Sequence, residues 1–387
     1  MTPSHQAAKR VLTAPTAQEG PLLVVDDFRT HFDTPAGMVK AVDGVSLTLD
    51  RGRTLGVVGE SGSGKTVLSR SLMGLLTARN VVRTGSATYN GQELVGASKQ
   101  QLRALWGTEM AMVFQDPMTS LNPVMKIGRQ ITEGLRYHLE MPKDEAEENA
   151  LQLLTSVGIP DPKRRLKQYP HELSGGMRQR VTIAIALACG PKLLFADEPT
   201  TALDVTVQAQ ILNLLNDQQR DRHMAMVLVT HDLGVVAGRT DEIAVMYAGQ
   251  IVEMASTRRL FSNVRMPYTE ALLKSIPKLE APSHTRLQII GGRPPDLVNP
   301  PPGCRFAPRC PYAQPKCHTD MPPLIEAETP GHVYRCWFPV GTEAGREALE
   351  RNLAHHVPAA EAAVTGDSAA AAAVEDAGLL IDAGGEA

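Results

Sequence analysis

Short apolar runs bounded by glycine or aspartate recur through the first two thirds of the sequence. They lie at residues 22–25, 42–49, 55–58, 192–196 and 224–229. Runs of this length are typical of β-strands, and the run at residues 55–58 has no polar side chain at all, which predicts a strand buried on both faces.

Helical periodicity fills the spaces between these runs. Leu68 and Leu72 share one face of a helix that should begin near Gly64. Residues 116–188 are predicted to be mostly helical, with an amphipathic helix at residues 145–157. Strands that alternate with helices predict an α/β domain with a largely parallel sheet.

The composition changes after about residue 260. Prolines cluster between residues 294 and 315, and from about residue 342 the chain is rich in alanine, glycine and glutamate. The latter segment lacks the large apolar side chains that offset the entropy of ordering. We therefore expect a disordered lead-in at residues 1–20, a main domain at 21–260, a loop-rich extension at 261–341 and a disordered tail at 342–387.

Charge and aromatic content argue against a nucleic-acid-binding role. The formal net charge is -3 and aromatic residues make up 4%, so the sequence offers neither a basic footprint nor a stacking platform for bases. No stretch reaches the ~18 consecutive apolar residues that span a bilayer. Residues 1–20 also lack the apolar run of a secretory signal. Any membrane role is therefore expected to depend on partner subunits.

The glycine-rich sequence GESGSGKT occupies residues 59–66, between the predicted buried strand and its helix. This is the P-loop pattern, in which backbone N–H groups and the helix dipole form a cradle for phosphate. A chance glycine-rich turn is the alternative, and the strand and helix on either side argue against it. Lys65 is expected to reach the β- and γ-phosphates of ATP, and Thr66 to bind Mg²⁺. The other expected ATP-binding positions are Gly59, Ser61, Gly62, Ser63 and Gly64.

A second apolar strand ends in two carboxylates. The run at residues 193–196 is followed by Asp197 and Glu198. Asp197 can hold Mg²⁺ directly or through water, and Glu198 can polarise the water that attacks the γ-phosphate. Alone this pattern is only moderately specific, because a solvated loop can carry the same residues.

The sequence LSGGM at residues 173–177 precedes an apolar helix and forms a second candidate anion site. Ser174, Gly175 and Gly176 would place backbone N–H groups at the positive end of that helix dipole. An ordinary N-cap with glycines is the alternative interpretation. One chain would then carry two phosphate-binding helix ends.

The order of these motifs resembles the nucleotide-binding domain of ABC transporters over about residues 22–253. The resemblance implies that Gln115 forms a Q-loop that senses Mg²⁺ and contacts membrane subunits. It also implies that Asp204 belongs to the D-loop and that His231 contacts the γ-phosphate. Phe32 lies where such domains stack an aromatic ring on adenine, although a core position is the other interpretation. The catalytic residues that the resemblance implies are Lys65, Gln115, Glu198 and His231.

One position departs from the family signature, which commonly has glutamine where this chain has Met177. The preceding Ser174, Gly175 and Gly176 are intact, so we expect the signature to function. In this family two domains pair head to tail, and each ATP lies between one P-loop and the other domain's signature. A chain with a single copy of each therefore implies a second ATPase domain.

Four of the five cysteines crowd into 33 residues, with the spacing Cys304-x5-Cys310-x6-Cys317-x18-Cys336. Four thiolates suit either a [4Fe–4S] cluster or structural Zn²⁺, and the spacing alone leaves both open. Disulfides or idle thiols are a third interpretation, which fits a reducing compartment less well. Cys189, inside an apolar helix, is expected to belong to the core.

The same region resembles the C-terminal extension of oligopeptide and dipeptide importer ATPases. The resemblance rests on PYT at residues 267–269, LL at 272–273, GCRF at 303–306 and RCPY at 309–312. It implies an iron–sulfur cluster, which we expect to act as a structural brace. It also implies a heterodimer with a related ATPase, two membrane permeases and an extracytoplasmic peptide-binding protein. The chain would then lie peripherally at the cytoplasmic face of the inner membrane.

The expected function is ATP-driven uptake of di- and oligopeptides across the cytoplasmic membrane. The nearest alternative is the same type of importer carrying nickel or another small solute, because this subunit contacts no cargo. A soluble ABC ATPase that acts on ribosomes or in DNA repair would usually carry two such domains or a coiled-coil insertion. A metal-dependent binding module with a vestigial nucleotide site conflicts with the intact Lys65, Glu198 and His231.

Overall fold

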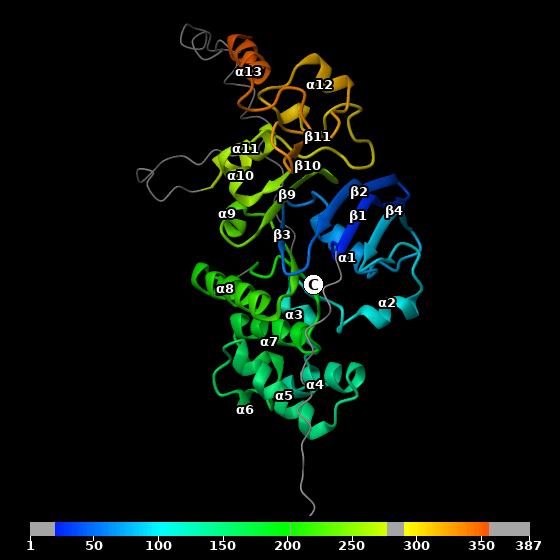
Figure 1. The fold of residues 1–387 in the computed structure, drawn as a ribbon, viewed down its shortest axis with the longest axis vertical. Helices are drawn as coiled ribbons and strands as arrows, with labels where there is room; N and C mark the ends of the chain where they lie inside the picture. The colour runs from blue at the N-terminus through cyan, green and yellow to red at the C-terminus, as the bar shows by residue number, and fades with distance from the viewer. Residues whose placement is uncertain (1–19, 202, 277–289, 356–387) are drawn as a thin grey trace, which may run out of the picture.

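The computed structural model describes residues 20–201, 203–276 and 290–355. Figure 1 shows two sheets in the middle of the molecule, with helices α4, α5 and α6 at one end and the C-terminal elements α12 and α13 at the opposite end. The predicted lead-in, apart from residue 20, lies outside the described residues, as does the predicted tail from residue 356 onwards.

The smaller sheet is antiparallel and has the strand order β2-β1-β4-β5. Its strands are β1 (Leu23–Thr34), β2 (Gly37–Leu49), β4 (Val81–Tyr89) and β5 (Gln92–Glu93). The apolar runs at residues 22–25 and 42–49 belong here and not to the parallel sheet. The reason is the short connection between β1 and β2, which permits a hairpin but no parallel crossover.

The larger sheet has the order β11-β12-β10-β9-β3-β8-β7-β6, and its strands from β9 to β6 run parallel. This confirms the α/β fold with a largely parallel sheet. β3, β7 and β8 are buried at every position, as their uninterrupted apolar runs predict. The parallel strands are β3 (Thr54–Val58), β6 (Met110–Val113), β7 (Leu193–Asp197), β8 (Ala225–Thr230) and β9 (Glu242–Tyr247). The antiparallel strands are β10 (Gln250–Ser256), β11 (Ile325–Glu326) and β12 (Val333–Tyr334).

The helices between β6 and β7 form a subdomain at the lower end of Figure 1. Buried Ile131, Leu135, Ala150 and Leu154 belong to the same core cluster as Val181, so α4, α5 and α7 share one apolar interior. The subdomain contains α3 (Pro117–Ser120), α4 (Ile127–His138), α5 (Lys143–Ser156), α6 (Pro162–Arg165), a 3₁₀ turn (Pro170–Glu172) and α7 (Gly175–Leu187). The remaining helices of the main domain are α1 (Lys65–Leu72), α2 (Lys99–Leu105), α8 (Val205–Arg222) and α9 (Leu233–Val236).

The C-terminal extension continues the larger sheet, because β12 pairs with β10. It contains α10 (Thr257–Ser262), α11 (Pro267–Lys274), a 3₁₀ turn (Ala307–Arg309), α12 (Pro315–Thr319) and α13 (Glu343–His355).

The prediction that disorder begins at residue 342 is wrong over α13. Ala348 is fully buried, and the side-chain amide of Asn352 donates hydrogen bonds to the carbonyl oxygens of Pro311 and Ala313. The amide of Gln314 donates to the carbonyl oxygen of Ala348. Contacts with the proline-rich loop, which the composition of the tail does not reveal, therefore order this helix.

Candidate active site

The P-loop connects β3 to α1, and its glycines fit close to neighbouring backbone. Gly64 is the N-cap of α1 with φ 101°, a left-handed conformation that favours glycine. A Cβ at this position would lie 2.2 Å from the carbonyl oxygen of Ala41, so no larger residue fits without rearrangement. The Lys65 ammonium donates hydrogen bonds to the carbonyl oxygens of Gly59 and Glu60 at 2.8 and 2.9 Å. Burial lowers the pKa of Lys65, although the carboxylates around it oppose the shift.

Asp197 lies fully buried at the end of β7, with oxygens suited to a Mg²⁺ site. The Thr66 hydroxyl donates to its Oδ1 at 2.8 Å, whereas its Oδ2 accepts no hydrogen bond from the described residues. Arg70 Nε lies 3.9 Å from that second oxygen. Burial raises the pKa of Asp197. A hard cation such as Mg²⁺ prefers oxygen donors, so Thr66 and Asp197 fit the Mg²⁺ ion that accompanies ATP.

Glu198 is the centre of the polar contacts at this site. Its Oε2 accepts hydrogen bonds from the Gln115 amide and the Thr201 hydroxyl, both at 3.0 Å. His231 Nδ1 lies 3.5 Å from the same oxygen, and Lys65 Nζ lies 3.9 Å from Oε1. The four residues predicted to be catalytic therefore converge.

Glu198 also has an unusual backbone. Its φ of 45° is in the left-handed region, which non-glycine residues enter at an energetic cost. The carboxylate-bearing turn directly follows β7, so the fold holds this conformation at the point where the parallel strands end.

These residues open into a cavity of about 690 Å³. Eight predicted residues line it: Ser61, Gly62, Gly64, Lys65, Thr66, Gln115, Glu198 and His231. Gly59, Ser63 and Asp197 are buried residues outside that lining. Phe32 lies half-buried on β1 and outside the lining, and its contact with adenine stays a prediction.

The signature residues lie at the start of α7, outside this cavity. The Ser174 hydroxyl caps the helix by accepting from the backbone N–H of Met177 at 3.4 Å. Gly176 packs closely on Val207 of α8, since a Cβ would lie 2.8 Å from its Cγ1. Gly175 occupies the same first turn. The half-buried Met177 packs on the core, which explains how α7 accommodates this departure from the family signature.

Asp204 lies beside the signature as the N-cap of α8. Its Oδ1 accepts a hydrogen bond from the backbone N–H of Val207 at 2.9 Å. Asp204 therefore caps α8 within a single chain, without any partner domain. Since Gly176 packs on the same Val207, Asp204 and the signature lie close together.

All four clustered cysteines line one small cavity in the extension, namely Cys304, Cys310, Cys317 and Cys336. Burial raises the pKa of each thiol, that of Cys336 to about 12. Each of these cysteines is a free thiol. Within the described residues, no three or more Cys, His, Asp or Glu side chains are arranged to hold a single metal ion.

Sequence reasoning missed two residues that brace the P-loop. The Tyr268 hydroxyl accepts a hydrogen bond from the backbone N–H of Glu60 at 2.8 Å. The guanidinium of Arg309 binds both carboxylate oxygens of Glu60, at 2.6 and 2.8 Å. Tyr268 belongs to the PYT sequence that signalled the extension, whereas Arg309 is separated from Glu60 by 249 residues, with no motif to link them.

Two family models match the sequence. The model described as ABC transporter matches residues 42–201, and the model described as oligopeptide/dipeptide transporter, C-terminal region, matches residues 252–317. Among the described residues, no helix combines the length and apolar character needed to cross a membrane.

Curated relatives extend this similarity over most of the chain. It is 50% identical to the oligopeptide transport ATP-binding protein OppD of Escherichia coli (strain K12), over 85% of this chain and 97% of the relative. It is 47% identical to the dipeptide transport ATP-binding protein DppD of Bacillus subtilis (strain 168), over 82% and 94%. A solved dimeric structure of a bacterial ABC transporter cassette aligns with a TM-score of 0.55 and 25% identity, covering 61% of this chain and 99% of that chain. The chain therefore belongs to the family of ATP-binding subunits of oligopeptide and dipeptide ABC transporters.

Proposed function

We propose that this chain is the ATP-hydrolysing motor of an importer that takes up di- and oligopeptides. The observation that carries the proposal is the convergence of Lys65, Gln115 and His231 on Glu198, in a family whose relatives are named for peptide transport. The nickel or small-solute alternative would use the same motor, and the names of the relatives and of the matching C-terminal family model favour peptides.

The contacts around Glu198 suit hydrolysis by an attacking water. Lys65 and the P-loop N–H groups would hold the phosphates, with the γ-phosphate near Glu198. Glu198 would accept a proton from water while the water oxygen bonds to the γ-phosphorus and the bond to ADP breaks. Gln115 and His231, which both contact the same carboxylate, would orient it. Bound Mg²⁺ would neutralise charge on the phosphate oxygens.

The signature residues require a second ATPase domain in this proposal. Ser174, Gly175 and Gly176 lie outside the chain's own nucleotide cavity, and the related cassette was solved as a dimer. ATP between two domains would favour the closed dimer, and hydrolysis would let it open. A related ATPase, two permeases and an extracytoplasmic binding protein complete the machine, with this subunit peripheral on the cytoplasmic face.

The partner set can be tested by purifying a tagged chain in mild detergent. Recovery of permeases and a second ATPase would support the proposal. Recovery of ribosomes without permeases would contradict it and favour the soluble class of ABC ATPase.

The cargo can be tested by uptake in cells that lack the endogenous gene. Wild-type chain should restore accumulation of radiolabelled trialanine, and Lys65→Ala should not, because the phosphate contacts are lost. Restoration of ⁶³Ni²⁺ uptake without trialanine uptake would favour the alternative cargo. The exposed Lys99→Ala provides a matched control, since it lies outside the nucleotide cavity and should restore uptake.

We further propose that the cysteine cavity holds a [4Fe–4S] cluster as a structural brace. One buried and three half-buried thiols, all with raised pKa values, would gain most from a cationic inorganic centre that stabilises their thiolates. Each thiolate of such a cluster binds a different iron, so the sulfurs need not converge on a single ion. Zn²⁺ is the alternative occupant.

Metal and sulfide analysis of anaerobically purified protein separates these occupants. Iron and acid-labile sulfide near four each per chain, lost in Cys310→Ser and retained in Cys189→Ser, would support the cluster. One zinc without sulfide would favour Zn²⁺ instead. Protein without any metal would contradict both.

A further inference from the structure

The nucleotide cavity joins a polar group of residues to an apolar one. The polar group, Gln115, Glu198 and His231, comes from segments that follow β6, β7 and β8 of the parallel sheet. The apolar group includes Ala41 of β2 and Leu297, which belongs to the C-terminal extension. A residue of the C-terminal extension, far beyond the P-loop in sequence, therefore forms part of the wall.

Backbone contacts hold Leu297 beside the P-loop. The backbone N–H of Lys40 donates a hydrogen bond to the carbonyl oxygen of Leu297 at 3.0 Å, which places it next to Ala41. The carbonyl oxygen of Ala41 in turn abuts Gly64 at the start of α1. Val298 packs against the β1–β2 turn, where a Cβ on Gly37 would lie 2.8 Å from its Cγ1.

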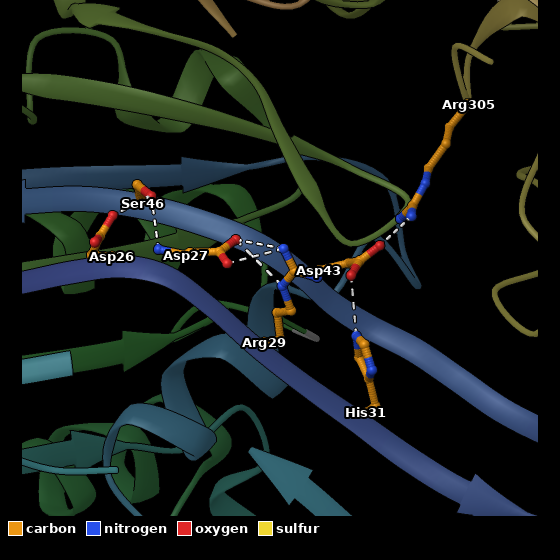
Figure 2. A network of polar contacts seen from close by, with 7 residues as sticks. All are labelled: Asp26, Asp27, Arg29, His31, Asp43, Ser46 and Arg305. Carbon is orange, nitrogen blue, oxygen red and sulfur yellow. Dashed lines mark hydrogen bonds and ion pairs between the residues drawn. The ribbon is translucent and has the colours of Figure 1, made fainter. Parts of the chain in front are cut away.

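Two buried arginines anchor the segments that follow Leu297. Arg305 donates to the carbonyl oxygen of Ala248 and to the carboxylate of Asp43, which also contacts His31 Nε2 at 3.1 Å. Figure 2 shows Arg305 reaching from the extension to Asp43, with His31 on the other side of that carboxylate. The side chain of Arg309 is 4% exposed and forms the paired contact with Glu60 of the P-loop.

From this placement we propose that Leu297 binds the adenosine part of ATP. A triphosphate on the P-loop with its γ-phosphate near Glu198 leaves the nucleoside to extend away from that polar group. The apolar surface of Ala41 and Leu297 is available there, and an apolar side chain gains by covering a purine face. The extension would thus complete the nucleotide site of its own chain, whichever cargo or partner the transporter uses.

The test compares two truncations in one segment. Leu297 and Val298 are both half-buried, but only Leu297 lines the cavity. Calorimetric titration of the full chain with Mg²⁺ and a non-hydrolysable ATP analogue should show about five- to tenfold weaker binding for Leu297→Ala. Binding of Mg²⁺–tripolyphosphate, which lacks the nucleoside, should be unchanged, and Val298→Ala should match wild type for both ligands.

Unchanged affinity of Leu297→Ala for the ATP analogue would overturn the proposal. An equal loss for tripolyphosphate would also overturn it, because the effect would then come from a displaced P-loop. Photolabelling of the wild-type chain with 8-azido-ATP avoids any folding defect of the variants. Covalent label should appear in the peptide that contains Leu297, and label confined to other segments would contradict the assignment.

Discussion

Two sets of charged residues differ in how their charges are paired. One set, Asp197 and Lys65, lies at the end of the nucleotide cavity that would hold the phosphates, which we call the phosphate end. The other set, Asp43 and Glu60 with Arg305 and Arg309, anchors the C-terminal extension. At the phosphate end, burial raises the pKa of Asp197 and lowers the pKa of Lys65. At the anchor, burial pushes the pKa of Asp43 upward, but hydrogen bonds from Arg305 and His31 outweigh it and lower the pKa overall. Hydrogen bonding to Glu60 raises the pKa of Arg309.

The difference separates charges that await a ligand from charges that are already paired. One oxygen of Asp197 has no hydrogen-bond donor among the described residues, so the folded chain alone compensates this carboxylate poorly. Mg²⁺ and phosphate would supply the missing interactions. Asp43 and Glu60 meet arginines from the extension, so their charges are paired without a ligand. The fold thus keeps an electrostatic cost at the functional site, whereas the charges that anchor the extension are already paired.

The largest effect should come from removing the proton acceptor of the phosphate end, the Glu198 carboxylate, and should appear in the rate of ATP hydrolysis. Glu198→Gln keeps the shape of the side chain but cannot accept a proton from water. We expect ATP hydrolysis to fall by about 10²–10⁴-fold while nucleotide binding persists. Glu133→Gln, an isosteric change at an exposed position of α4, is the control and should hydrolyse ATP at the wild-type rate. Wild-type turnover of Glu198→Gln would remove Glu198 from the catalytic role.

The anchors should show their effect in stability. Arg309→Ala leaves the Glu60 carboxylate without its paired guanidinium and should lower the free energy of unfolding by about 2–3 kcal/mol. Arg53→Ala is the matched control, because the Arg53–Asp241 pair has a similar distance, 2.6 Å, but a 62% exposed arginine side chain. That change should cost less than about 1 kcal/mol. Urea unfolding midpoints measure both, and equal losses would contradict the distinction.

Lowering the pH should reveal how much the Asp43 carboxylate contributes to the free energy of unfolding. Its folded pKa lies below its unfolded value, so its stabilisation is present above the unfolded pKa, near ~3.9, and is lost as pH falls through the folded pKa. Asp43→Asn should lower the free energy of unfolding at pH 6 by about 1–2 kcal/mol. The variant should then lose less stability than wild type between pH 6 and pH 3. Asp27→Asn, at an exposed carboxylate, serves as control. If Asp27→Asn reduced the loss of stability between pH 6 and pH 3 more than Asp43→Asn does, the role of Asp43 would be contradicted.

Asp197 should show the opposite sign. Its folded pKa lies above the unfolded value, so its charge opposes folding at neutral pH and this penalty disappears in acid. Without nucleotide, Asp197→Asn should raise the free energy of unfolding by about 1 kcal/mol at pH 7. The asparagine side chain retains an oxygen that can accept from the Thr66 hydroxyl. The gain should shrink towards pH 4. Loss of stability at pH 7 would mean that Thr66 and Arg70 already compensate the charge.

Sequence reasoning succeeded where the chemistry is local. The P-loop is one contiguous segment that follows a strand, and Asp197 and Glu198 are adjacent residues at the end of another strand. Each motif therefore also specifies where its residues lie in the fold. It failed where distant segments meet, as in the Arg309–Glu60 pair and the wall residue Leu297. It also failed for α13, whose weakly apolar sequence is ordered by contacts with the proline-rich loop. The cysteine spacing, by contrast, led us to expect that the four clustered cysteines act together, and all four line one cavity.

The most direct test of the contrast measures how much Mg²⁺ and a non-hydrolysable ATP analogue stabilise three chains against urea. At about 100 times the dissociation constant, the ligand should raise the free energy of unfolding of wild type by about 2.7 kcal/mol. Asp43→Asn should keep most of this gain despite its lower starting stability, whereas Asp197→Asn should lose the part that depends on Mg²⁺. A full gain in Asp197→Asn together with a lost gain in Asp43→Asn would contradict the account.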